Sequence, residues 1–297
     1  MNPTRPEPQN RLDDPADEQT SDPGRNTHRT SPRAPEPSAV EVHGPARVIA
    51  VANQKGGVGK TTSTINLGAA LAEYGRRVLL VDFDPQGALS VGLGVQPHQL
   101  EATVYNLLME RDTDPAEVLQ DTGVENMDLL PSNIDLSAAE VQLVTEVGRE
   151  QALGRSLKRF LPDYDVVLID CQPSLGLLTI NALACADAVL VPLACEFFSL
   201  RGVALLMDTI DKVRDRLNPD LDLLGVLATM YDTRTLHTRE VHERVVEAFG
   251  DKVFDAVINR TIKFPETTVA GEPITQWAPT SYAADSYRML AREVIAR

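Results

Sequence analysis

The chain has 297 residues, with 28 Lys and Arg against 43 Asp and Glu, so its formal net charge is -15. This acidic balance excludes a generally basic protein that wraps nucleic acid, and any DNA contact must come from a local patch. The composition, 43% apolar and 24% charged, suits one large α/β domain with a tail at this chain length.

The cysteines and the apolar runs point to a reducing compartment. Cys171, Cys185 and Cys195 form no Cys-x-x-Cys pair, and an odd number of cysteines cannot all join in disulfides. No apolar run approaches the roughly 18 to 20 residues that a membrane span needs, and the first 46 residues contain no apolar signal-peptide core. We therefore expect a cytoplasmic protein without a membrane partner.

Residues 1–46 differ in composition from the rest of the chain. They contain nine prolines, five arginines and eight acidic residues, with almost nothing to bury. Such a segment cannot offset the entropy lost on ordering, so we predict a disordered tail, either a partner-docking arm or a solvating extension. Residues 47–297 are then the folded domain.

From Arg47 onward, short apolar runs alternate with longer stretches of helical spacing, as in βαβ units. Strands are expected at 48–52, 77–81, 127–130, 165–169, 188–192, 221–229 and 252–258. Helices are expected at 60–74, 137–160, 174–184, 199–217, 237–249 and 281–296. Several strands are apolar on both faces, which favours a P-loop NTPase-like α/β fold: a mostly parallel, twisted sheet with helices on both faces.

A glycine-rich tract lies directly between the first strand and the first helix. It reads Lys55-Gly56-Gly57-Val58-Gly59-Lys60-Thr61-Thr62, with Gln54 where the motif G-x-x-x-x-G-K-[ST] has its first glycine. Glycines allow positive φ, so that backbone N–H groups turn onto phosphate oxygens at the positive end of the helix. In such a loop Lys60 reaches the β and γ phosphates and the Thr61 hydroxyl ligates Mg²⁺.

Lys55 is not explained by this phosphate loop alone. An ammonium group five residues before the P-loop lysine is not needed for the phosphates of the chain's own nucleotide. Lys55 therefore indicates a partner subunit.

Acidic residues end two further apolar strands. Asp82 and Asp84 follow the run from Arg77, and Asp170 follows Val166 to Ile169. Ligands bind at the carboxyl edge of an open parallel sheet, and an acid there can hold Mg²⁺. Taken singly, each could instead cap the following helix. Together with the P-loop they predict a magnesium site of Thr61, Asp82, Asp84 and Asp170.

These features together resemble the ParA/Soj-type chromosome and plasmid partitioning ATPases, within the deviant Walker A family that also includes the MinD proteins. The resemblance covers about residues 47–297. Besides the P-loop, the segments that carry it are 79–87, 103–108, 130–133, 196–202 and 229–235, together with the last helix.

The resemblance implies a role for each matching residue. Lys55 is the signature lysine, which crosses to the nucleotide of a second subunit in an ATP-dependent sandwich homodimer, and Lys60 is the P-loop lysine. Asp84 matches the switch acid that positions or activates the attacking water, Asp82 the neighbouring switch position, and Asp170 the Walker B acid. ATP and Mg²⁺ are the implied cofactors. The implied activity is hydrolysis of ATP to ADP and phosphate, slow until a ParB-type centromere-binding partner stimulates it.

The resemblance also implies non-specific binding of double-stranded DNA, and hence association with the nucleoid. Arg234 and Arg260 match basic positions that the family uses for this purpose, and Lys263 lies at another basic position of the same segment. Composition does not reveal such a patch, because residues 225–297 contain nine Lys or Arg and ten Asp or Glu. A few cations doubled by dimer symmetry are enough to contact phosphates.

Two segments depart from the family pattern. Gln172 stands where family members more often have the first of two consecutive prolines. Residues 264–270 read F-P-E-T-T-V-A, where a Leu-Ser-Glu-Ala-Pro run is commoner, although Glu266 is retained.

Three alternatives remain. A MinD-like membrane-cycling ATPase needs a C-terminal amphipathic helix with a basic face, but Asp285 and Glu293 interrupt the basic residues of 281–297. A metabolic enzyme would leave the Arg234 segment unexplained, and in an iron–sulfur carrier cysteines would have to bridge the dimer. A nucleotide switch without hydrolysis would leave Asp84 without a function.

Overall fold

The computed structural model of the chain describes residues 34–110, 112–196 and 199–297, without the side chains of residues 199–201. In this part of the chain eight strands form one sheet in the order β3-β4-β2-β5-β1-β6-β7-β8. All neighbours pair in parallel except β3, which runs antiparallel to β4. The strands are β1 (Arg47–Val51), β2 (Val78–Phe83), β3 (Gln120–Val124), β4 (Met127–Leu130), β5 (Val166–Cys171), β6 (Ala188–Ala194), β7 (Asp222–Tyr231) and β8 (Val253–Asn259).

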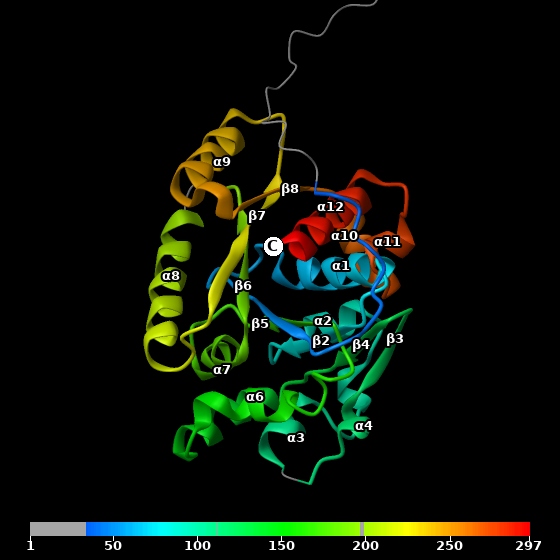
Figure 1. Ribbon diagram of the computed structural model, residues 1–297, viewed down its shortest axis with the longest axis vertical. Coiled ribbons are helices and arrows are strands. Elements are labelled where there is room, and N and C mark those ends of the chain that lie inside the picture. Colours follow the sequence, from blue (N-terminus) through cyan, green and yellow to red (C-terminus); the bar gives the residue numbers. More distant parts are fainter. Residues whose placement is uncertain (1–33, 111, 197–198) are drawn as a thin grey trace, which may run out of the picture. The chain divides into compact units, whose positions relative to one another are not determined.

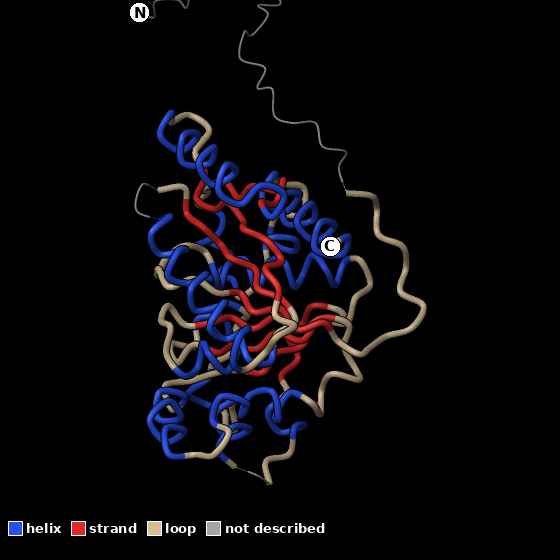
Figure 2. Tube along the Cα trace, turned by 60° about the vertical axis from the view of Figure 1, so that its left-hand side comes forward, coloured by secondary structure: helices blue, strands red, loops and turns tan. Residues whose placement is uncertain are grey.

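Helices cover both faces of the sheet (Figure 1; Figure 2). Helices α1, α2, α11 and α12 contribute to the apolar layer on one face, and α3 to α9 to the layer on the other. The helices are α1 (Lys60–Glu73), α2 (Ala88–Gly92), α3 (Val104–Met109), α4 (Pro115–Val118), α5 (Leu136–Gln142), α6 (Ala152–Leu157), α7 (Leu177–Cys185), α8 (Ser199–Arg216), α9 (Leu236–Phe249), α10 (Lys263–Ala270), α11 (Ile274–Trp277) and α12 (Tyr282–Ala296).

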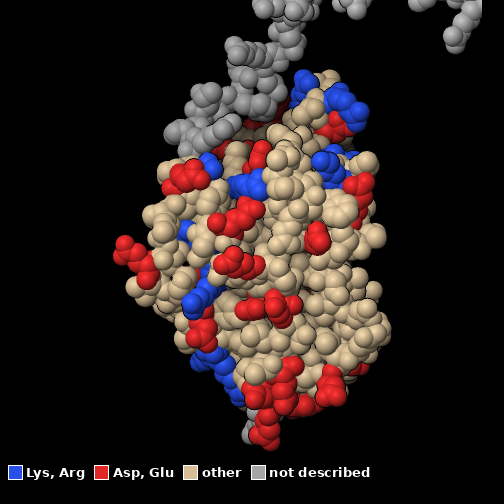
Figure 3. Space-filling model, turned by 90° about the vertical axis from the view of Figure 1, so that its right-hand side faces the viewer, with Lys and Arg blue, Asp and Glu red and all other residues tan. Residues whose placement is uncertain are grey.

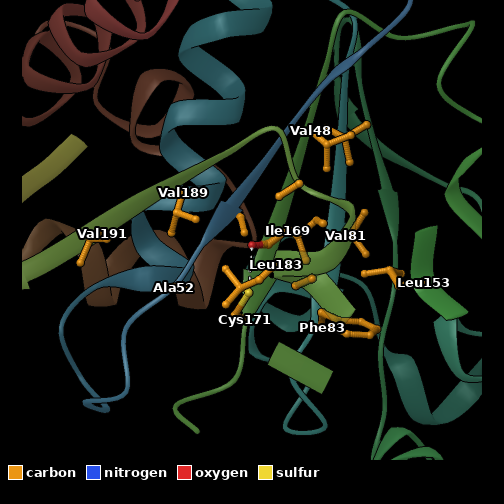
Figure 4. Packing of buried hydrophobic residues seen from close by; sticks show 14 of the residues in the cluster. Val48, Ala52, Val81, Phe83, Leu153, Ile169, Cys171, Leu183, Val189 and Val191 are labelled. Atoms are coloured by element: carbon orange, nitrogen blue, oxygen red, sulfur yellow. Dashed lines mark hydrogen bonds between the residues drawn. The ribbon is translucent and has the colours of Figure 1, made fainter. Parts of the chain in front are cut away.

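Alternate residues of the central strands divide between these two layers. On β2, Val81 and Phe83 join the layer of α7, whereas Leu80 joins the layer of α1. All six residues of β2 are buried, as expected for a parallel strand covered on both faces. Cys171 lies in the same layer as Phe83 and Leu183 (Figure 4), so its thiol is on the opposite face of β5 from Asp170.

The expected α/β fold is confirmed, and each predicted strand matches an observed one to within two residues. The strand β3 was not predicted. The prediction of one helix over 137–160 is wrong, because α5 ends at Gln142 and short 3-10 turns separate it from α6. Gly148 takes a left-handed conformation (φ 67°) within the interruption, which a continuous helix does not allow.

The predicted tail lies outside the described residues as far as Arg33. Before Arg47, residues of the tail already contact the domain. His43 Nδ1 lies 2.7 Å from Asp165 Oδ2, and the Gly44 N–H donates to Asp165 Oδ1 at 3.0 Å. Asp165 also accepts a hydrogen bond from the Arg77 N–H at 2.8 Å, so it joins the entry to β1 with the entry to β2.

Candidate nucleotide and magnesium site

Residues 52–59 form the loop between β1 and α1. Gly57 (φ 70°) and Gly59 (φ 84°) adopt the left-handed conformation that glycine tolerates best. A Cβ at Gly57 would meet nothing within 4 Å, so its backbone angle rather than lack of space requires glycine. No side chain caps α1 at Gly59, which leaves the first N–H groups of the helix available to an anion.

Lys60 is the first residue of α1, and its side chain is turned back over this loop. The residue is 7% exposed, and its Nζ donates to the Lys55 carbonyl oxygen at 3.2 Å. Burial lowers the pKa of Lys60, while the charges of Asp170 and Asp84 nearby raise it. A partly desolvated ammonium over an open loop is suited to phosphate oxygens.

Thr61 and Asp170 meet at the carboxyl end of β5. The Thr61 hydroxyl donates to Asp170 Oδ2 at 2.7 Å, and Asp170 is 1% exposed. Burial, followed by the charge of Asp82, raises the pKa of Asp170 to about 8. Hydroxyl and carboxylate oxygens are the ligands Mg²⁺ prefers, so the pair fits this ion. Among the described residues no group of three or more His, Cys, Asp and Glu could hold a metal ion.

Asp82 and Asp84 lie at the end of β2, as predicted, but in different surroundings. Asp82 is 0% exposed and accepts from both the N–H (2.9 Å) and the hydroxyl (2.7 Å) of Ser90 on α2. Burial raises the pKa of Asp82 to about 7, against the effect of these hydrogen bonds. Asp84 is partly exposed, and its Oδ1 accepts from the Gln86 N–H at 3.0 Å. The metal role of both residues stays a prediction.

Lys55 is paired within its own chain. Its Nζ donates to Glu196 Oε2 at 2.6 Å, just after β6, and the two side chains are 38% and 53% exposed. Sequence reasoning placed Glu196 in a family segment but gave it no role. The pair joins residues 141 positions apart, which a local pattern cannot reveal.

Two further polar residues that sequence reasoning missed support the loop. The Thr229 hydroxyl on β7 donates to the Val58 carbonyl at 2.8 Å. Asn53 donates to the Pro192 carbonyl at 2.7 Å and accepts from the Lys55 N–H at 3.0 Å. Asn53 follows β1, and Thr229 lies two residues before the end of β7, so both lie near the carboxyl edge of the sheet. That position is the signal in the sequence that could have identified them.

Of the predicted DNA-binding residues, Arg234 lies on the loop after β7, Arg260 on the loop after β8, and Lys263 at the start of α10. Arg234 is 86% exposed and pairs with Asp232 through Nε–Oδ1 (3.0 Å) and Nη2–Oδ2 (2.8 Å). The N–H of the exposed Arg260 donates to the Tyr231 carbonyl at 3.0 Å, which brings the two loops together. Lys263 begins α10 and makes no ion pair with a described residue. Figure 3 shows one face of the molecule, on which basic and acidic side chains mix without a continuous basic surface.

The two segments that depart from the family pattern are both folded. Gln172 donates to Glu140 on α5 at 3.4 Å, so the loop after Asp170 is attached to a helix. Residues 264–270 lie within α10.

Comparison with known proteins shows the family of the chain. A protein-family model described as an AAA domain matches residues 46–223. An uncharacterised protein of Mycobacterium tuberculosis (strain CDC 1551 / Oshkosh) is 68% identical over 267 residues, which cover 90% of this chain and 84% of that protein. The sporulation initiation inhibitor protein Soj of Bacillus subtilis (strain 168) is 46% identical over 250 residues, covering 84% of this chain and 98% of Soj.

A solved structure described as cobyrinic acid a,c-diamide synthase from Mycobacterium smegmatis, with bound ADP and magnesium, is 46% identical. The match covers 83% of this chain and 92% of the solved chain, with a TM-score of 0.73. Chromosome-partitioning proteins therefore match this chain over most of their length. The chain belongs to the Soj/ParA family of chromosome-partitioning ATPases.

Proposed function

We propose that this chain is an ATP-hydrolysing DNA segregation protein. Its ATP-bound form is a homodimer that binds double-stranded DNA without sequence preference, and a ParB-type partner releases it by stimulating hydrolysis. The observation that carries this proposal is the shared edge of the sheet: β7 supports the P-loop through Thr229 and, five residues later, presents Arg234. The carboxyl end of β7 therefore contacts the P-loop and also leads into the candidate DNA-binding loop.

The residues of the site divide the work of phosphoryl transfer. The P-loop N–H groups and the Lys60 ammonium would bind phosphate oxygens, and Thr61 and Asp170 would hold the metal. Bound ATP with Mg²⁺ supplies the γ-phosphoryl group and the positive charge that neutralises its oxygens. Asp84, which is partly exposed beside this site, orients the attacking water. Positioning and charge neutralisation then account for most of the rate.

DNA binding follows from Arg234 and Arg260 on adjacent loops. One subunit offers few cations, and Asp232 already pairs with Arg234, so a single copy binds DNA weakly. A dimer doubles the number of cations on one DNA, and each phosphate contact adds to the affinity and to its salt dependence. ATP favours the dimer, so ATP favours DNA binding, and hydrolysis reverses both. In a cell such a protein is cytoplasmic and associated with the nucleoid.

DNA binding of the purified protein tests this proposal. Fluorescence anisotropy with two unrelated duplexes is measured with ATP, with ADP and without nucleotide, across a salt series. We expect binding only with ATP, equal for both duplexes and falling steeply with salt. Binding that is absent with ATP, or equal in all three nucleotide states, would reject the proposal.

The solved structure from Mycobacterium smegmatis suggests a second candidate, amidation of a small carboxylic acid. Such a reaction needs ATP to activate the carboxylate and a source of ammonia. A protein that takes ammonia from glutamine commonly uses a reactive cysteine, but Cys171 and Cys195 are buried here, and burial raises the pKa of the Cys185 thiol to about 12. ATP turnover that requires the acid and an ammonia donor, and ignores DNA, would favour this candidate.

Membrane cycling finds no support in the last helix. Tyr287, Leu290 and Val294 of α12 are at most 4% exposed, so its apolar stripe is already packed on the domain. Glu293 accepts from the N–H groups of Asp255 (2.9 Å) and Ala256 (2.8 Å), which attaches the helix to β8. No helix in the described part of the chain is long and apolar enough to span a bilayer. Liposome sedimentation with ATP is the matching test.

A further inference from the structure

The side chain of Lys55 is the movable part of an otherwise fixed residue. Its N–H donates to Asn53 Oδ1 at 3.0 Å, and its carbonyl oxygen accepts from Lys60 Nζ at 3.2 Å. Asn53 is in turn bound to the Pro192 carbonyl on β6. Only the four-carbon side chain of Lys55 can redirect the ammonium, and in the isolated chain it is directed to Glu196.

The charges around Glu196 make this pair specific but weak enough to break. The hydrogen bond and charge of Lys55, with a smaller contribution from Arg260, hold the pKa of Glu196 below its usual value. Both side chains are more than a third exposed, so solvent screens the pair. Arg260 stays near Glu196 when Lys55 leaves, so the carboxylate keeps a positive neighbour and release of Lys55 costs little.

We propose that Glu196 holds Lys55 in the monomer and competes for its ammonium with the nucleotide phosphates of a second subunit. This inference rests on the proposed function, in which Lys55 crosses to the partner's nucleotide. Glu196 is a positioning residue: it acts on dimerisation through Lys55 and contacts no nucleotide itself. Each dimer requires two such pairs to break, so Glu196 sets how tightly ATP assembles the dimer.

The size of the effect follows from the exposure of the pair. An exposed ion pair shifts an equilibrium about 1.4-fold to 5-fold, so two pairs shift dimerisation about 2-fold to 30-fold. Glu196→Gln removes the charge and keeps the shape, so it should tighten the dimer by this factor. Asp208→Asn is a matched control, because Asp208 and Lys212 form another 2.6 Å pair, 62% and 64% exposed, on α8.

The dissociation constant of the dimer is measured by sedimentation velocity with a slowly hydrolysed ATP analogue and Mg²⁺, for the parent, Glu196→Gln and Asp208→Asn. We expect tighter dimers for Glu196→Gln alone. Equal or weaker dimerisation of Glu196→Gln, in a parent that dimerises, would overturn this inference and leave the proposed function standing. A parent that stays monomeric with nucleotide would contradict the proposed dimer as well.

Lysine labelling tests the pair in the monomer, where folding and dimerisation do not interfere. With a trace of acetic anhydride and no nucleotide, Glu196→Gln should raise the acetylation rate of Lys55 at least 2-fold and leave Lys212 unchanged. Asp208→Asn should raise the acetylation rate of Lys212 and leave that of Lys55 unchanged. An unchanged rate at Lys55 in Glu196→Gln would show that the pair does not form and would overturn the inference.

Discussion

Asp82 and Asp170 lie opposite each other on the neighbouring strands β2 and β5, and each buried carboxylate has a different hydroxyl partner. Ser90 binds Asp82 and so attaches α2 to the sheet, whereas Thr61 binds Asp170 and attaches the start of α1. Two adjacent buried carboxylates repel, so the charge of Asp82 adds to burial in raising the pKa of Asp170. The same sheet edge thus has one acid bound to the scaffold and one directed to the P-loop.

Substitution of Asp82 should therefore affect folding more than nucleotide binding. Asp82→Ala leaves the Ser90 N–H and hydroxyl without their acceptor, and we expect a loss of about 2 to 4 kcal/mol in the free energy of unfolding. Asp82→Asn keeps an oxygen for Ser90 and removes the repulsion with Asp170, so its loss should stay below about 1 kcal/mol. Urea denaturation at pH 7 without nucleotide measures both. Equal stabilities of Asp82→Ala and the parent would contradict this assignment.

Removal of the Lys60 ammonium should abolish nucleotide binding without harming the fold. Lys60 is partly desolvated and burial lowers its pKa, so Lys60→Ala removes a group that is costly to bury. We expect an unchanged or higher thermal midpoint and a loss of ATP affinity of at least about 100-fold, since two or more charge-assisted hydrogen bonds are lost. Calorimetric titration with ATP and Mg²⁺ measures the affinity, with the exposed Lys212→Ala as control. Normal ATP binding by Lys60→Ala would contradict the assignment of residues 55–62 as a P-loop.

The sequence was most informative where neighbours in the chain are also neighbours in space. The P-loop is contiguous, and β2 and β5 are continuous apolar runs, so both could be predicted directly. The strand β3 reads Gln-Asp-Thr-Gly-Val and lies at the sheet edge, where burial imposes little pattern. The prediction of one helix over 137–160 was wrong at Gly148, because the spacing of apolar residues does not reveal a left-handed backbone conformation.

Side-chain partners were the part that could not be predicted. The Lys55 partner, Glu196, follows β6, and the Val58 partner, Thr229, lies on β7. Both are far along the chain from the P-loop, and only the strand order brings them to it. For Arg234 the partner is two residues away, but a carboxylate at that spacing can also face solvent. The sequence therefore located the groups of the site, and the fold determined which of them are paired.

Asp84 should be needed for turnover and not for ATP binding. It is partly exposed and holds only the local turn through the Gln86 N–H, so Asp84→Ala should fold normally. We expect ATP affinity within about 3-fold of the parent and hydrolysis lowered at least about 100-fold, the scale of a lost general base. Asp121→Ala on β3 is the control, because Asp121 makes the same contact with the N–H two residues on, at 2.7 Å. A phosphate-release assay measures the rate, and turnover near that of the parent would exclude Asp84 from the chemistry.

Asp165 should make the stability of the domain sensitive to acid. Burial would raise its pKa, but the His43 ring and the N–H groups of Arg77 and Gly44 hold the pKa below its ordinary value of 3.8. The folded carboxylate is thus harder to protonate than the unfolded one, so its contribution is complete above pH 3.8 and disappears as the pH falls through the folded value. Asp165→Ala should lose about 2 to 4 kcal/mol at pH 7 and less near pH 2, where the carboxylate is already protonated in the unfolded chain. Urea denaturation at the two pH values, without nucleotide, measures this. A loss of equal size at both would show that the carboxylate charge is not involved.

Release of Arg234 from Asp232 should strengthen DNA binding. The bidentate pair holds the pKa of Asp232 to about 2, so the carboxylate is ionised under all ordinary conditions and offsets the charge of Arg234. Asp232→Asn should raise ATP-dependent DNA affinity about 2-fold to 10-fold, because the guanidinium then meets phosphate without a competing anion. Asp255→Asn on β8 is the control. It removes the same charge from an exposed site with no ion pair to Arg234, and so separates the release of Arg234 from the change in net charge. Arg234→Glu should keep ATP-dependent dimerisation and lose DNA binding. Anisotropy at several salt concentrations measures all three variants, and equal affinities of Asp232→Asn and Asp255→Asn would show that the pair does not restrain Arg234.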